Sequence, residues 1–162
     1  MSKNAVTIEQ LKIACRHVRE LTNAGMTPNL AIRNLEQFVN IYAKFKTLGH
    51  ASPDHALQYK RWSVEALKLE AANPGRKFGE YLRVEHGTPR RQFAKMVWKG
   101  FEEGNLTTEW LDDLCERKWR VAVITHEEDR RLPRSEAMND PEERWRTAKI
   151  EMSDRTGVNA DK

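Results

Sequence analysis

Two short stretches combine a histidine with carboxylates, the side chains that most often bind metal ions or transfer protons near neutral pH. Glu85-His86 precedes Gly87-Thr88-Pro89, which predicts a junction between a strand and a helix. The second stretch is His126-Glu127-Glu128-Asp129. One hypothesis is therefore a metal-dependent nuclease or hydrolase that uses Glu85, His86 and His126, and it requires the two histidines to converge in the fold.

The first stretch resembles the start of an HNH-type nuclease site, in which a His closes a strand and a helix follows. The resemblance covers only a few residues around Glu85-His86-Gly87 and implies nuclease chemistry there. That family also uses a second His or Asn on a nearby helix, and residues 87–104 contain neither. Asn105 and His126 stand at other spacings. The alternative is a surface or hydrogen-bonded His86 at a turn.

The second stretch has a simpler explanation in helix capping. Thr125 followed by Glu128 is a capping box, and carboxylates are favoured in the first turn of a helix by its exposed N–H groups. Consecutive helical residues also point in different directions, so the four side chains of 126–129 cannot all bind one ion. We therefore expect a helix to begin at His126.

The positive charge is concentrated in the middle of the sequence. The chain has a net charge of +4, and residues 74–100 contain seven basic and two acidic residues. The basic residues are Arg76, Lys77, Arg83, Arg90, Arg91, Lys95 and Lys99. Arg91, Lys95 and Lys99 recur at every fourth position, which places them on one face of a predicted helix. Such a row suits the neutralisation of phosphates, so residues 76–99 are predicted to contact nucleic acid. The alternative is an ordinary solvated helix face.

An acidic helix follows the basic one. Its carboxylates are Glu109, Asp112, Asp113 and Glu116. The two helices, joined by Glu-Glu-Gly-Asn and followed by a strand, suggest a helix-turn-helix like the first part of a winged helix. Four carboxylates on the recognition helix would oppose entry into a major groove, so the preceding basic helix must face any DNA. We expect the acidic helix, together with Trp98, to contact a protein or another copy of the chain.

Helix signals dominate the first 73 residues. Thr7 with Gln10 is a capping box, Thr27-Pro28 and Ser52-Pro53-Asp54 are helix starts, and Gly25 and Gly49 are helix ends. Apolar residues recur at helical spacing behind each start, among them Tyr59, Trp62, Ala66 and Leu69 behind the third. The prediction is a mostly α fold that begins with a three-helix antiparallel bundle over residues 7–73.

Residues 76–132 are predicted to form a small unit that contains the basic and acidic helices and a two-stranded β ribbon. Residues 78–84 and 119–125 are the two expected strands, since β-branched and aromatic residues cluster there. The alternative extends the acidic helix through residue 124. We expect one globular domain over residues 1–132, then a polar extension with a short helix (133–154) and a disordered tail (155–162).

Composition narrows the remaining function classes. No apolar run approaches the length of a membrane span, the N-terminus lacks an apolar signal core, and the two cysteines fall on apolar helix faces. These features predict a soluble cytoplasmic protein, and no cofactor-binding motif is present. The leading interpretation is a non-enzymatic binding protein for nucleic acid or a nucleoprotein complex, such as an accessory or mobile-element protein. A protein-interaction or inhibitor module that acts through its charge asymmetry is the third hypothesis.

Overall fold

The computed structural model describes residues 5–134 and 139–155 of the 162-residue chain. Each of its two compact units is built from two separate pieces of the chain. Met1–Ser52 and Pro89–Trp119 form one, here called the helical unit. Pro53–Thr88 and Arg120–Lys162 form the other, the sheet unit. No helix in the described part of the chain is long and apolar enough to cross a membrane.

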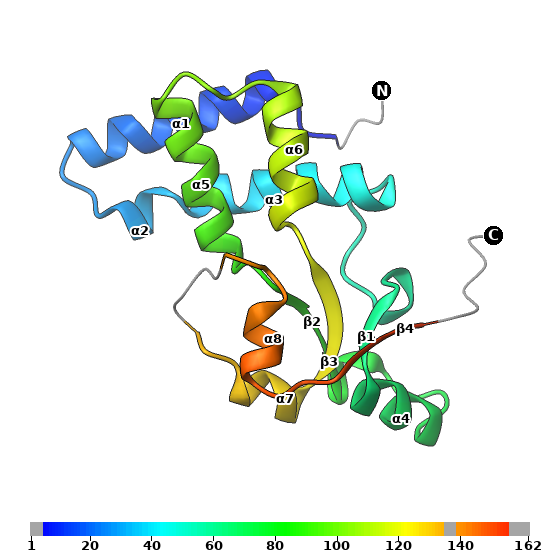
Figure 1. Cartoon of the computed structure of the whole chain (residues 1–162). Coiled ribbons are helices and arrows are strands. Elements are labelled where there is room, and N and C mark those ends of the chain that lie inside the picture. The colour runs from blue at the N-terminus through cyan, green and yellow to red at the C-terminus, as the bar shows by residue number, and fades with distance from the viewer. Residues whose placement is uncertain (1–4, 135–138, 156–162) are drawn as a thin grey trace. The chain divides into compact units, whose positions relative to one another are not determined.

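The helical unit consists of α1 (Ile8–Asn23), α2 (Pro28–Ala31), α3 (Arg33–Leu48), α5 (Arg90–Glu102) and α6 (Thr108–Lys118) (Figure 1). Its core is made of fully or almost fully buried apolar side chains from four of these helices. They include Leu11, Cys15, Val18, Leu35, Val39, Phe93, Val97 and Leu111. The helical spacing of these residues in the sequence is what places them on one face of each helix.

Helix ends in this unit follow the capping signals of the sequence. Thr7 accepts a hydrogen bond from the Gln10 amide, and the Gln10 side chain accepts from the Thr7 amide, which makes a complete capping box before α1. Gly49 ends α3 in the left-handed conformation at φ 76°, which glycine adopts without steric cost. Thr107 accepts from the Trp110 amide and caps α6.

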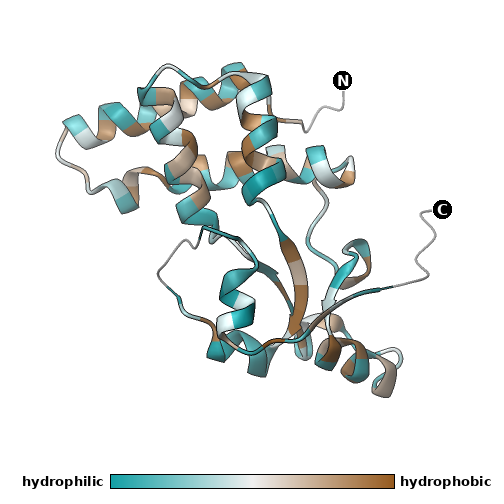
Figure 2. Cartoon of the chain, in the orientation of Figure 1, coloured by the Kyte–Doolittle hydropathy of each residue, from teal (hydrophilic) through white to brown (hydrophobic). Residues whose placement is uncertain are grey.

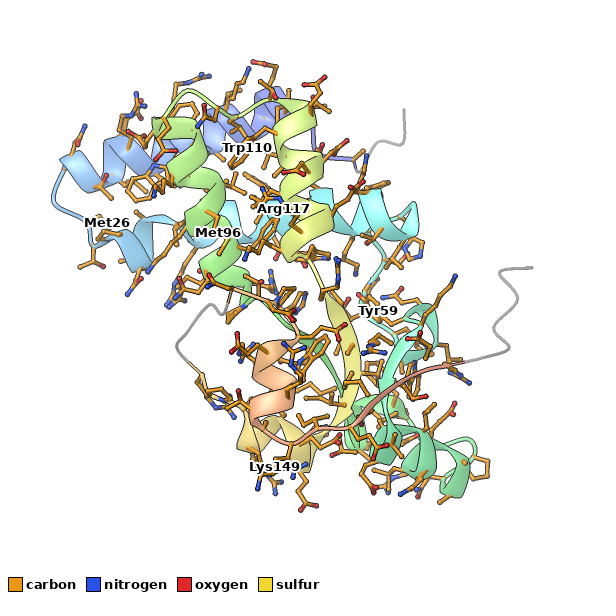
Figure 3. The ribbon with its side chains drawn as sticks, in the orientation of Figure 1. Met26, Tyr59, Met96, Trp110, Arg117 and Lys149 are labelled. Atoms are coloured by element: carbon orange, nitrogen blue, oxygen red, sulfur yellow. The ribbon has the colours of Figure 1, made fainter. Side chains whose placement is uncertain are left out.

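Close packing joins α5 to α6 at Gly100. A Cβ atom at Gly100 would overlap the ring of Trp110, so the absence of a side chain lets the indole lie against α5. Figure 3 shows Trp110 on α6 beside α5. The two predicted helices of the basic and acidic segment are thus both present and pack together.

The sheet unit has four strands in the order β2-β3-β1-β4. These are β1 (Arg61–Ser63), β2 (Leu82–His86), β3 (Val121–Thr125) and β4 (Met152–Asp154). The central pair β1 and β3 is parallel, and β2 and β4 pair with them antiparallel. Three helices, α4 (Val64–Ala72), α7 (His126–Arg131) and α8 (Glu143–Thr147), and the 3-10 turns η1 (Ala56–Gln58) and η2 (Phe78–Glu80) complete the unit.

The core of the sheet unit is built around β3. Ala122, Val123 and Ile124 are fully buried, and β3 is the most continuously apolar strand in Figure 2. Ala122 and Ile124 pack with Leu132, Trp145, Ala148 and Ile150 in one apolar cluster. A strand buried in this way reads as a continuous apolar run, which is why it could be found in the sequence.

The mostly α class is confirmed, and the two predicted strand segments pair in part, since β2 and β3 form an antiparallel ladder. The predicted strand 78–84 overlaps β2 only at residues 82–84, because Phe78–Glu80 form the turn η2. The sheet nevertheless has four strands, and the extension predicted over residues 133–154 supplies β4 and α8 to it. Within the predicted tail, 155–162, Arg155 is described and donates to Glu70 at 3.1 Å. The rest of that tail lies outside the described residues.

The three-helix bundle over residues 7–73 is not confirmed. Its third segment contains η1, β1 and the nine-residue α4, and it belongs to the sheet unit. Trp62, expected on a helix face, lies in β1 opposite Val123 on one side and Ser153 on the other. Pairing with two distant strands satisfies the β1 backbone, and this outweighs the local helical spacing. In the helical unit α5 and α6 join α1 and α3 instead.

Candidate nucleic-acid interface and the histidine sites

The two histidines of the catalytic hypothesis lie at opposite ends of the β2–β3 ladder. His86 pairs with Val121, whereas Leu82 pairs with Thr125, the residue before His126. The register therefore separates them by four residue pairs, about 14 Å along the strands. No group of three or more His, Cys, Asp or Glu side chains among the described residues could hold a metal ion. Glu85, His86 and His126 thus do not form one centre.

Glu85 instead contacts an arginine that the sequence analysis did not single out. Arg144 Nη1 donates to Glu85 Oε1 at 3.0 Å and to the His86 carbonyl at 2.8 Å. Its Nε and Nη2 both donate to the carbonyl of Pro133, at 3.1 and 2.9 Å. The fork geometry of the guanidinium allows one side chain to hold α8, the end of β2 and the loop after α7 together.

The Glu85 carboxyl is largely buried beside Arg144, with 17% of its side chain exposed. Burial raises its pKa above the ordinary value, and the attraction of Arg144 opposes this shift without cancelling it. Its partner Arg144 is only 4% exposed. Glu85 and Arg144 thus form a largely buried ion pair at the end of β2.

His126 begins α7, as the capping interpretation predicts. Thr125 accepts from the Glu128 amide at 3.1 Å, and the Glu128 carboxylate accepts from the Thr125 amide at 2.8 Å. The same carboxylate oxygen accepts from the hydroxyl of Ser63 at 2.6 Å, and Ser63 caps α4. Glu128 therefore ties together the starts of the two helices that follow the parallel strands β1 and β3.

A hollow of about 580 Å³ lies where β1 and β3 end. It is lined by Glu65, Leu69, Tyr81, Thr125, His126, Glu127, Glu128, Arg130 and Arg131. The carboxyl ends of parallel strands are a common place for ligands in α/β folds. Here the lining mixes three carboxylates with two guanidinium groups, and His126 Nε2 is buried without a hydrogen-bond partner in the described residues. The charges that line the hollow therefore favour neither an anionic nor a cationic ligand.

The predicted nucleic-acid-binding segment is divided between the two units. Arg76, Lys77 and Arg83 belong to the sheet unit. Arg76 pairs with Glu80 at 2.9 Å and Arg83 with Asp129 at 3.0 Å, so both cations have an acidic neighbour. Lys77 is exposed and has no such partner in the part of the chain that the structure describes.

The other four basic residues lie on α5. Arg91 pairs with Glu36 of α3 at 2.7 Å, and Arg90 donates to Gln37 at 2.8 Å. Lys99 Nζ lies 3.8 Å from Glu103 Oε1. Lys95 has no ion-pair partner among residues 5–134 and 139–155. Arg91, Lys95 and Lys99 project from the side of α5 opposite its buried residues Phe93 and Val97, as their spacing predicts. We call these three the α5 row.

The acidic residues predicted to contact a protein lie on α6, and they differ in whether they already form ion pairs within the chain. Asp112 accepts from the Tyr42 hydroxyl at 2.7 Å and from Lys46 at 2.5 Å, which links α6 to α3. Asp113 pairs with Arg117 one turn later on the same helix. Glu109 and Glu116 are exposed, and no cation in the described residues pairs with them. Trp98 is half-buried, and its indole N–H finds no partner there either.

Charge is distributed unevenly between the units. By sequence the helical unit has 13 basic and nine acidic residues, while the sheet unit has 15 of each. The whole net charge of +4 therefore belongs to the helical unit, where the α5 row lies. No family model, curated protein or solved structure matches this chain.

Proposed function

We propose that the protein is a non-enzymatic binding module whose helical unit contacts nucleic acid through α5. The observation that carries the proposal is the α5 row, three cations on one face of one helix in the unit that has the entire net positive charge. Arg91 and Lys99 are exposed and Lys95 is half-buried. Phosphates follow one another along a nucleic-acid backbone, so a row of cations can neutralise several of them at once.

The acidic neighbours of the row are compatible with this role. The Arg91 and Lys99 side chains are 44% and 77% exposed, and exposed pairs contribute at most about 1 kcal/mol to stability. A phosphate offers the guanidinium the same bidentate geometry as a carboxylate. A phosphate can therefore take the place of Glu36 at Arg91, and the exchange leaves a Glu36 carboxylate that is 18% exposed without its cation.

Phosphate contact without base contact follows from the acidity of the neighbouring helix. Glu109 and Glu116 would repel the backbone if α6 approached a major groove. The contacts we assign to the row position the protein on a duplex or a single strand and discriminate little between sequences. Glu109, Glu116 and Trp98 remain for a protein partner, which suits a component of a nucleoprotein complex or an accessory protein of a mobile element.

The test is fluorescence anisotropy with labelled duplex DNA, single-stranded DNA and RNA over a series of salt concentrations. For duplex DNA, the triple variant Arg91→Ala, Lys95→Ala, Lys99→Ala should lower affinity and reduce the logarithmic salt slope by about 0.9 for each lost contact. A matched triple variant in the sheet unit, Lys60→Ala, Lys68→Ala, Arg146→Ala, removes the same charge at exposed positions and should change affinity much less. The proposal is wrong if the wild type does not bind nucleic acid, or if the two triple variants lose the same amount of affinity.

A further inference from the structure

Besides the hollow at the ends of β1 and β3, the sheet unit has one of about 280 Å³ beside η1 and η2. Its lining comes from η1, the end of α4, the turn that follows α4, η2 and the start of β2. We call it the η1–η2 pocket. Its volume is at the small end of ligand pockets, so it suits one small molecule or one planar group of a larger one.

Aromatic rings form much of the lining of this pocket. The rings belong to His55, Trp62, Phe78 and Tyr81. Trp62 and Tyr81 are almost fully buried, whereas His55 is exposed and Phe78 is half-buried. The centroids of the His55 and Phe78 rings are 5.5 Å apart, at an interplanar angle of 58°. These two rings therefore offer aromatic surface to a ligand from solvent.

The charges around the pocket favour an anion. Arg76 and Lys77 line it, and both are exposed. Glu70 is the one carboxylate among the described lining residues, and it accepts a hydrogen bond from Arg155 at 3.1 Å, so its charge is offset. Lys77 has no ion-pair partner in the described part of the chain. A free cation thus stands beside the two accessible rings.

The His55 ring also supplies a hydrogen-bond donor. Its Nδ1 accepts from the Leu57 amide at 3.3 Å. The neutral imidazole therefore carries its proton on Nε2, for which residues 5–134 and 139–155 offer no partner. Leu57, which is 44% exposed, adds apolar surface to the same lining. A ligand here meets a ring face, an apolar side chain, an N–H donor and a cation.

We propose that the η1–η2 pocket binds one nucleotide whose base is unpaired. The base lies against His55 and Phe78, and Lys77 neutralises the phosphate. Aromatic side chains beside basic ones bind unpaired bases in this way, and any base can stack because each has a π-face. A base inside a duplex is stacked on its neighbours and cannot reach the two rings.

The choice of a nucleotide among planar anions rests on the proposed function, but the pocket lies in the sheet unit and the α5 row in the helical unit. The two sites therefore differ in what they recognise. The α5 row contacts phosphates of any nucleic acid, whereas the pocket adds affinity only where a base is unpaired. The nucleotide belongs either to a single strand or to the free nucleotide pool, and the experiment separates these sources.

The first arm is fluorescence anisotropy with three labelled probes, namely a single strand, an abasic strand with the same number of phosphates, and a hairpin duplex. Phe78→Leu removes the ring and keeps an apolar side chain at this half-buried position. It should lower affinity for the single strand by roughly 5-fold or more, because stacking contributes about that much for each base. Affinity for the abasic strand and the duplex should stay unchanged, which also shows that the variant is folded. His55→Ala, at an exposed position, should give the same pattern.

Lys77→Ala tests the phosphate contact. It should lower affinity for the single strand and for the abasic strand alike, and reduce the logarithmic salt slope by about 0.7. The matched controls are Lys68→Ala, whose side chain is 67% exposed in the sheet unit, and Phe38→Leu, whose ring is 38% exposed in the helical unit. Both controls should leave affinity for the single strand nearly unchanged.

The second arm uses nucleotides without a strand. AMP and ribose 5-phosphate are titrated into the ¹⁵N-labelled chain up to about 20 mM, since one base and one phosphate give a dissociation constant on the order of millimolar. AMP should shift the amide signals of residues 75–82 more than ribose 5-phosphate, which lacks the base. If AMP does so in a chain that binds no strand, the pocket serves free nucleotides.

The inference is overturned if Phe78→Leu and His55→Ala affect intact and abasic strands equally and AMP shifts these signals no more than ribose 5-phosphate. Its failure is distinct from a failure of the proposed function. If Arg91→Ala, Lys95→Ala, Lys99→Ala keeps full duplex affinity while Phe78→Leu loses affinity for the single strand, the role of α5 is wrong and the pocket stands. The reverse pattern, together with the AMP result just given, removes the pocket alone.

Discussion

Arg144 and Glu85 form an ion pair of 3.0 Å in which the arginine side chain is 5% and the glutamate side chain 17% exposed. The cation also binds the carbonyls of His86 and Pro133. A residue in a polar C-terminal segment thus fixes the end of β2 where the sequence had suggested a catalytic His.

Arg144→Met should lower the free energy of unfolding by about 3 to 5 kcal/mol, because it leaves the Glu85 carboxylate buried without its cation. Arg146→Met, two residues later, removes a cation whose pair with Asp140 is exposed, and should leave the free energy of unfolding nearly unchanged. Urea denaturation measures the free energy of unfolding of each variant. A similar loss in the two would contradict the structural role of Arg144.

The Glu85 carboxyl should make stability depend on pH in a defined direction. Burial raises its pKa in the folded state, so the protonated form favours folding. Its contribution is complete below the ordinary carboxyl pKa and is lost as pH rises through the raised value. The melting temperature of the wild type, compared with Glu85→Gln, should therefore fall as pH increases across that window. A constant difference would show that the shift is absent.

Glu128→Ala should destabilise the sheet unit by about 2 to 4 kcal/mol, because the buried Thr125 amide and the Ser63 hydroxyl both lose their acceptor. Ser63→Ala should cost about 1 kcal/mol, and the double variant less than the sum, since the two groups share one hydrogen bond. The exposed neighbour Glu127→Ala is the control. Additive losses in denaturation experiments would mean that Ser63 and Glu128 act independently.

Three glycines should respond differently to alanine. A Cβ atom at Gly87 would overlap the backbone of Pro141, at Gly100 it would overlap the movable ring of Trp110, and at Gly79 it would meet nothing within 4 Å. We expect Gly87→Ala to be the most destabilising, Gly100→Ala to cost about 1 to 3 kcal/mol, and Gly79→Ala to be nearly neutral. Thermal melts would contradict this order if Gly79→Ala lowered the melting temperature as much as the other two variants.

Both cysteines should be inert in the native protein. Burial raises the pKa of Cys15 and of Cys115 to about 12, so almost no thiolate exists at neutral pH. A thiol reagent at pH 8 should label neither residue until denaturant is added, when two thiols should react. Rapid labelling of the native chain would show that the helical unit opens at these positions.

Local signals were sufficient for much of this structure. Thr7 with Gln10, Thr107 and Thr125 with Glu128 cap the helices that the sequence predicts there, because capping involves residues only three apart. The run from Val121 to Thr125 is a strand rather than an extension of α6, as its β-branched residues indicate. These features need no information from distant parts of the chain.

What the sequence could not show depends on distant residues. Trp62 has helical spacing to its neighbours and becomes a strand residue only because Val123 and Ser153 lie beside it. Glu36 and Asp129 pair with the predicted nucleic-acid-binding residues Arg91 and Arg83 from distant parts of the chain, and nothing local distinguishes them from other carboxylates. Arg144 is likewise one arginine of several in a polar segment. Its burial is a property of the assembled sheet unit.

The interleaving of the two units has a consequence for the order in which they can fold during translation. All pieces of the helical unit have been synthesised once Trp119 has been added to the chain. At that moment β1 still lacks both of its neighbours, since Val123 and Ser153 are not yet synthesised. We expect the helical unit to assemble first, while the edges of β1 stay open to chaperones until the last strand arrives.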